Sequence, residues 1–167
     1  MALLLERLKV ALLQKLEQRH GSETPLLVHS DLDLVGGEGT LLGCTYLQRQ
    51  HLDPLRTASE HLVLTNVVTG CTVLLNRALL QKALPIPAEA LMHDWWMALV
   101  ASGLGEIAFL PEPTVQYRQH GSNVLGAQGL GLSYWMRRLR NLFSDPSAGG
   151  HTRAALQQAK VFEHRYG

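Results

Sequence analysis

The feature that most constrains the fold is the alternation of short apolar runs with segments of helical period. Residues 26–29 form an apolar run of strand length, and residues 67–75 form a longer run rich in β-branched side chains. Through residues 3–19, leucines recur at every third or fourth position, which is the spacing of an amphipathic helix. Strand and helix signals that alternate along a chain are typical of layered proteins. The sequence therefore predicts an α/β fold.

Turn and helix-stop residues complete the predicted order of elements. The glycines of residues 36–39 predict a tight turn, after which residues 40–46 return as a second strand. Further along we predict, in order, a loop with one short helix, a central strand, two helices and two strands, over residues 47–62, 67–75, 77–83, 94–102, 107–110 and 114–117. Gly103 and Gly105 are expected to end the second of these helices.

The last part of the chain differs in character. An apolar stripe that contains Trp135 and Phe143, flanked by three arginines, predicts an amphipathic helix over residues 130–143. This helix either packs on its own domain or lies on a membrane surface or a partner. A linker is predicted over residues 145–150 and a polar helix over residues 152–164. We therefore divide the chain into a domain of residues 1–126 and a helical tail of residues 127–167.

Composition and charge exclude several classes of protein. The net charge of +1 gives the molecule no field that would select nucleic acid. No run approaches the ~20 apolar residues of a spanning helix, and Glu6 and Lys9 interrupt the leucines at the N-terminus before they resemble a signal peptide. Cys44 and Cys71 belong to no CxxC pair and indicate reduced thiols or one bridge. We predict a cytoplasmic protein, with peripheral membrane contact through residues 130–143.

The most unusual local group is His93, Asp94, Trp95 and Trp96, at the start of a predicted helix. Asp94 has two interpretations: an N-cap that accepts hydrogen bonds from the first turn, or a catalytic carboxylate. Two successive large aromatic residues are difficult to explain by packing alone. A carboxylate beside an apolar wall suits a site where a sugar ring is held while its hydroxyl meets a base.

Polar side chains also gather over residues 117–123, after a predicted strand. The guanidinium of Arg118 and the imidazole of His120 could contact a diphosphate or help to hold a divalent metal, and the alternative is an ordinary polar loop. Gly70, beside Thr69, permits close approach of a ligand to the backbone or marks a bulge. The pair of aspartates at 31 and 33 is interpreted as structural.

Residues 66–72, 92–96 and 117–123, taken together and in this order, resemble the bacterial family-2 glycosyltransferases. The nearest branch is the rhamnosyltransferase-like enzymes of surface-polysaccharide synthesis, and the resemblance covers about residues 1–126. It implies the C-terminal portion of a GT-A, Rossmann-like domain, followed by the helical tail. The implied reaction moves a sugar, with rhamnose indicated by the branch, from a nucleotide-sugar donor to a saccharide or lipid-linked acceptor, with inversion.

The resemblance also implies roles for individual residues. Asp94 matches the carboxylate that takes the proton of the acceptor hydroxyl. His93, Trp95 and Trp96 match its substrate-binding neighbours. Thr69, Gly70 and Arg118 are assigned to substrate binding as well, and His120 to the metal near the donor diphosphate.

This sequence departs from the family pattern in one large respect. The nucleotide-binding turn and the metal-binding Asp-x-Asp would precede the residue matched by Met1, and neither is present. A divalent metal, Mn²⁺ or Mg²⁺, is therefore expected only in the complete enzyme. The chain alone is expected to be inactive, and either to form homo-oligomers or to be poorly soluble. The alternatives are a non-catalytic sugar-binding or interaction module, and a metal-dependent hydrolase built on His93, Asp94 and His120.

Overall fold

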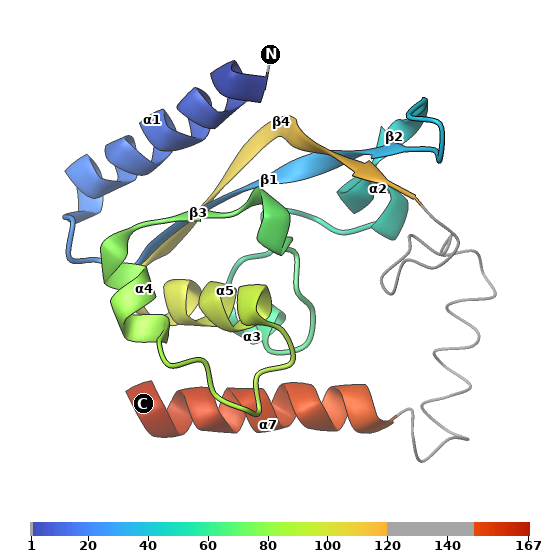
Figure 1. Cartoon of the computed structure of the whole chain (residues 1–167). Coiled ribbons are helices and arrows are strands. Elements are labelled where there is room, and N and C mark those ends of the chain that lie inside the picture. The colour runs from blue at the N-terminus through green and yellow to red at the C-terminus, as the bar shows by residue number, and fades with distance from the viewer. Residues whose placement is uncertain (1, 120–148) are drawn as a thin grey trace.

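A computed structural model describes residues 2–119 and 149–167 of the chain. It is a mixed α/β fold, in which a four-stranded mixed sheet is covered by helices on both faces (Figure 1). The α/β prediction is thereby confirmed. The predicted helix at 130–143 and the residue His120 lie outside the described residues.

The centre of the sheet is β1 (Leu26–Val35), which is buried at nearly every position. It pairs in parallel with β4 (Glu106–Arg118) along its whole length. Its other edge is shared by two short antiparallel strands, β3 (Leu74–Leu75) near its start and β2 (Leu41–Thr45) near its end. Because β1 has neighbours on both edges and helices on both faces, it begins with an uninterrupted apolar run, Leu26–Val28, and its polar residues His29, Ser30 and Asp31 are buried as well.

The prediction of a central strand over residues 67–75 is wrong. Only Leu74–Leu75 is a strand, and it is preceded by a 3-10 turn, η1 (Gly70–Thr72). The turn forms because the backbone N–H and the hydroxyl of Thr72 both donate to the Thr69 carbonyl, at 2.9 and 2.8 Å. These local hydrogen bonds compete with a strand ladder, and they outweigh the β-branched composition of the segment.

The two strands predicted on either side of the proline pair are two halves of β4. Leu110 pairs with Ser30 and Val115 pairs with Leu32, so residues 111–114 bulge out opposite a single residue of β1. Prolines have no N–H to donate to a ladder, which explains why the pairing breaks there.

The amphipathic helix predicted over residues 3–19 is confirmed as α1 (Ala2–His20). It covers one face of the sheet, with Leu12, Leu13 and Leu16 against Leu26 and Val28. The opposite face carries α4 (Arg77–Ala83) and α5 (His93–Leu104), close to the predicted bounds (Figure 1). The short helix α3 (Ser59–Leu62) lies beside α5, and α2 (Tyr46–Gln50) lies beside β1 and β2. Gly105 ends α5 as expected, whereas Gly103 lies within the helix.

The C-terminal helix α7 (Gly149–Tyr166) lies against α5, on the side away from the sheet (Figure 1). Phe162 and Tyr166 join the core cluster around Trp96 and Leu99. Arg165 donates hydrogen bonds to the carbonyls of Leu84 and Pro85. The helix begins at Gly149, so the last two residues of the predicted linker belong to it, and the others lie outside the described residues.

Candidate functional site

The carboxylate of Asp94 is the best-defined polar group among the predicted site residues. Its side chain is 5% exposed, in the first turn of α5. Oδ2 accepts a hydrogen bond from the Gly70 N–H at 2.8 Å, and Oδ1 accepts one from the Trp95 N–H at 2.7 Å. The N-cap is Met92, which makes no side-chain capping bond, so the interpretation of Asp94 as the N-cap is wrong. The segments around Gly70 and Asp94, which are far apart in the sequence, are thus joined directly.

The close contact between residue 70 and Asp94 leaves room only for a glycine. A Cβ at this position would lie 3.0 Å from His93 Nε2 and 3.2 Å from Asp94 Oδ2. The glycine therefore permits the close approach that the sequence suggested, although the group that approaches it belongs to the protein. His93 is exposed beside it, and Thr69 is half-buried and supplies the carbonyl that closes η1.

Both tryptophans are buried, and packing accounts for them. Trp95 is 4% exposed and donates its indole N–H to the Leu62 carbonyl. Trp96 has no exposed surface, donates to the Ala83 carbonyl at 2.9 Å, and lies against Phe162 and Tyr166. The argument that packing alone could not explain two successive tryptophans is therefore wrong. Their assignment to an acceptor pocket stays a prediction from the resemblance.

The third motif is described only in part. Arg118 is the last residue of β4, pairs in register with Val35, and is exposed. His120 lies outside the described residues, so its role as a metal ligand stays a prediction from the resemblance. Asp31 supports the structural interpretation, because its Oδ1 accepts hydrogen bonds from the N–H groups of Leu32 and Leu47 at 2.8 and 3.2 Å.

In proteins, the side chains that hold a divalent metal are mainly those of His, Cys, Asp and Glu. Within residues 2–119 and 149–167, no group of three or more His, Cys, Asp or Glu side chains comes together in a way that could hold an ion. Two surface hollows of about 540 and 610 Å³ are lined by residues between 31 and 67 and between 109 and 113, and neither includes Asp94 or Gly70.

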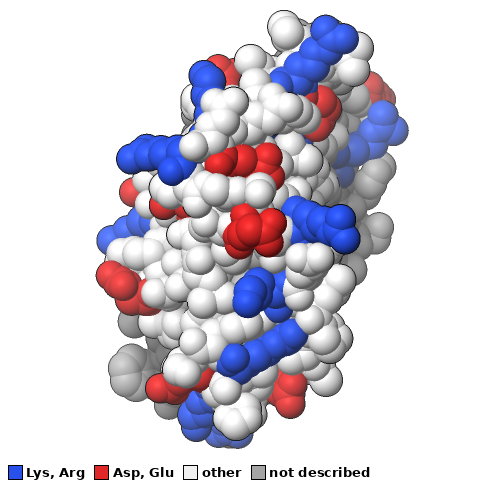
Figure 2. Space-filling view, turned by 90° about the vertical axis from the view of Figure 1, so that its left-hand side faces the viewer, with Lys and Arg blue, Asp and Glu red and all other residues white. Residues whose placement is uncertain are grey.

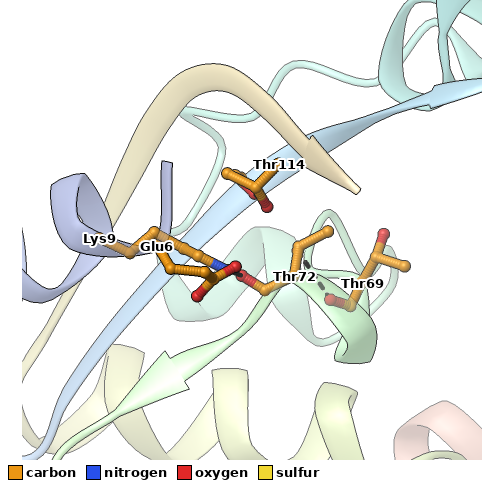
Figure 3. Close-up of polar contacts among 6 residues, drawn as sticks. Glu6, Lys9, Thr69, Thr72 and Thr114 are labelled. Atoms are coloured by element: carbon orange, nitrogen blue, oxygen red, sulfur yellow. Dashed lines mark hydrogen bonds and ion pairs between the residues drawn. The ribbon is translucent and has the colours of Figure 1, made fainter. Parts of the chain in front are cut away.

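Sequence reasoning missed Lys9, which lies behind the same turn. Its side chain is 3% exposed, and its Nζ contacts the Thr72 carbonyl at 3.4 Å and Glu6 Oε1 at 2.9 Å. Figure 3 shows Glu6 and Lys9 of α1 directed toward Thr72, and Thr72 bonded to Thr69. The sequence carried a signal for the burial of Lys9, though not for its place behind the turn, because Lys9 stands at helical spacing between the apolar positions 5 and 12.

The pKa of the Cys71 thiol depends on the charged groups around this turn. Partial burial raises the pKa of Cys71 above its ordinary value, and the carboxylate of Asp94 raises it further. The ammonium of Lys9 acts in the opposite direction and lowers it. Opposite charges therefore act on one exposed side chain between them.

Comparison with protein-family models, with curated proteins and with solved structures found no match. None of the helices within the described ranges is long and apolar enough to cross a membrane. On the face displayed in Figure 2, acidic and basic side chains are interspersed among the described residues. That face therefore presents no single-sign patch of the kind that attracts a phosphate backbone.

Proposed function

We propose that this chain is the acceptor-side part of an inverting GT-A-type glycosyltransferase, similar to the bacterial family-2 enzymes, with Asp94 as the general base. The observation that carries the proposal is the hydrogen bond from the Gly70 N–H to Asp94 Oδ2. It joins two of the three motifs on which the resemblance depends, and it holds the carboxylate in a fixed orientation beside an exposed histidine.

The geometry suits proton transfer. An ionised carboxylate has about four positions at which it can accept a hydrogen bond. Backbone N–H groups occupy one position on each oxygen of Asp94, which leaves acceptor capacity for a hydroxyl. In the proposed step the acceptor oxygen bonds to the anomeric carbon as the bond to the diphosphate breaks. The hydroxyl proton passes to Asp94.

The substrates that the resemblance implies are a nucleotide-sugar donor and a saccharide or lipid-linked acceptor, with rhamnose indicated by the nearest branch. Arg118 and His120 are assigned to the donor diphosphate and its metal by resemblance. By the same resemblance, Mn²⁺ or Mg²⁺ belongs in this proposal to the donor-binding half, on whichever polypeptide that half lies. We derive no step through it.

A second candidate is an interaction module without catalysis, and one observation favours it. Among the described residues, β4 pairs only with β1, so its outer edge has no strand partner. Near the start of α1, Leu3 and Leu4 are 69% and 61% exposed. Open strand edges and exposed apolar residues both promote association with another chain.

Saccharide titration followed by amide NMR tests the proposal on the chain itself. If Asp94 faces an acceptor site, saccharides at millimolar concentration should shift the amide signals of Gly70 and His93. Asp94→Asn should reduce these shifts, whereas Asp33→Asn, a half-buried carboxylate in β1, should not. A panel of surface-polysaccharide fragments that leaves both amides unmoved would favour the interaction module.

A further inference from the structure

The η1 turn is held at its two ends by side chains of opposite charge. At its start, the Gly70 N–H donates to the carboxylate of Asp94 on α5. At its end, the Thr72 carbonyl accepts from the ammonium of Lys9 on α1. A negative group at the N-terminal end of a helical turn and a positive group at its C-terminal end both match the direction of the peptide dipoles. One short turn thus connects helices from the two faces of the sheet.

Hydrogen bonds within the turn link its last residue to the residue just before its first. Thr72 has no exposed surface, and both its N–H and its hydroxyl are bonded to the Thr69 carbonyl. Gly70 lies so near α5 that a Cβ added to it would be 3.0 Å from His93 Nε2 and 3.2 Å from Asp94 Oδ2. A change in the position of Thr72 must therefore change the position of the Gly70 N–H.

Lys9 is not an ordinary surface lysine. Its side chain is buried at 3% exposure, whereas that of its ion-pair partner Glu6 is 52% exposed. Burial of an ammonium is unfavourable unless it is paired and hydrogen-bonded, so an apolar side chain would fill this position at a lower cost in free energy. The contacts available to it here are Glu6 and the end of the turn.

We propose that Lys9 is a positioning residue for Asp94, which acts by fixing the Thr72 end of the Gly70–Thr72 turn. When the turn is held in this position, its Gly70 N–H donates to the carboxylate of Asp94 and orients it. This inference rests on the proposed function, because positioning matters for catalysis only if Asp94 is the base. Lys9 itself touches neither Asp94 nor the reacting atoms.

Alkylation of Cys71, the central residue of the turn, tests the coupling without any substrate. If Lys9 acts only as a distant charge, Lys9→Met removes a group that lowers the pKa of Cys71, and alkylation below that pKa becomes slower. If Lys9 holds the turn, its loss releases Cys71 from burial and from Asp94, which both raise the pKa. Alkylation then becomes faster, because a lower pKa raises the thiolate fraction. The two cases therefore predict opposite changes in the alkylation rate of Cys71.

The expected result is faster iodoacetamide alkylation of Cys71 in Lys9→Met, in the same direction as in Asp94→Asn, with the Cys44 peptide measured in the same digest as an internal control. Lys15→Met, an exposed lysine of the same helix, should leave the Cys71 rate unchanged, and Lys9→Arg should restore it. Slower alkylation in Lys9→Met overturns the proposal. Equal acceleration at Cys44 also overturns it, because Lys9 would then support the fold as a whole.

Hydrogen exchange at the Gly70 amide gives a second readout. Lys9→Met should lower the protection of Gly70 by about tenfold while the amides of α4 keep theirs, because local opening need not involve the whole domain. If Lys9→Met does not fold, Glu6→Gln replaces it and should produce a smaller change of the same sign at both Cys71 and Gly70. Unchanged Gly70 protection in a folded variant overturns the proposal. These readouts need no sugar, so the coupling can hold even if saccharide titration rejects the proposed function.

Discussion

The rings of Trp96 and Phe162 lie edge to face, with their centroids 6.3 Å apart and their planes inclined by 73°. One residue belongs to α5 and the other to α7, so this contact ties the C-terminal helix to the helix that carries Asp94. Gln158 strengthens the tie, because its side-chain oxygen accepts a hydrogen bond from the Leu91 N–H at 3.0 Å, just before α5 begins. The polar helix predicted as part of a tail therefore packs into the main core.

The Phe162 ring occupies the space beside Gly103, and a Cβ at Gly103 would collide with it. We expect Gly103→Ala to destabilise the protein by about 1–3 kcal/mol, because overpacking outweighs the better helix propensity of alanine. In a Phe162→Ala background the same substitution should be neutral or stabilising. Urea unfolding of the four members of this double-mutant cycle measures the difference. An equal cost in both backgrounds would show that the ring and the glycine do not interact.

Asp94→Asn should abolish most turnover in an assembled, active enzyme while acceptor binding survives. Positioned bases contribute on the order of 10²–10⁴-fold in rate, and an amide cannot take the proton. The amide nitrogen also cannot accept one of the two backbone hydrogen bonds, so we expect a loss of about 1–2 kcal/mol of stability. Steady-state kinetics and thermal unfolding check both effects, with Asp33→Asn as the control. Near-normal turnover in Asp94→Asn would contradict the assignment.

His29 is expected to make the fold sensitive to acid. It has no exposed surface, and neither ring nitrogen has a hydrogen-bond partner within the described structure. Burial lowers the pKa of His29 from 6.5 to about 4, partly offset by the nearby Pro54 carbonyl and Asp31. The unfolded chain therefore binds the proton more readily than the folded one. The contribution is full above pH 6.5 and is lost as the pH falls toward 4.

From these two pKa values the loss at pH 4.5 is roughly 2–3 kcal/mol. Carboxylates titrate in the same range, so the informative quantity is the difference between the wild type and His29→Leu. Urea unfolding at pH 7 and pH 4.5 should show a smaller pH dependence in His29→Leu. The same pH dependence in both proteins would mean that His29 is protonated without cost.

The helix predicted at 130–143 is expected to bind anionic membranes or a partner through its apolar stripe and its arginines. It lies outside the described residues, so this prediction rests on the sequence. Co-sedimentation with vesicles of anionic and neutral lipids measures it. Replacement of Arg137, Arg138 and Arg140 by Gln should weaken binding to the anionic vesicles. Absence of binding by the wild-type chain would remove the membrane alternative.

Purified by itself, the chain is expected not to bind nucleotide-sugars tightly. The resemblance places nucleotide and metal binding in a segment that this sequence does not contain, and charge stabilisation of the leaving diphosphate depends on such groups. Calorimetric titration with a panel of nucleotide-sugars, with and without Mn²⁺, measures the affinity. Tight binding that requires the metal would show that these residues form a complete donor site.

Sequence patterns predicted the helices, strands and turns that depend on residues close together in the chain. The leucine spacing of α1 and the glycine that ends α5 could be recognised because helix period and helix-stop chemistry act within a few residues. The apolar run at the start of β1 and the glycine turn before β2 followed in the same way. The α/β class is a consequence of these elements and their order.

Only the tertiary structure decided what meets across the chain. The residues around Gly70 have strand composition, yet they form a turn: local bonds to Thr69 close it, and Asp94 and Lys9 bond to its two ends from distant segments. The two tryptophans resembled a sugar platform in the sequence, and they are buried because Leu62, Ala83 and the rings of α7 surround them. Hydrogen bonds and packing between distant segments carry no periodic signal, so no pattern along the chain could have placed Lys9 behind the turn that holds Asp94.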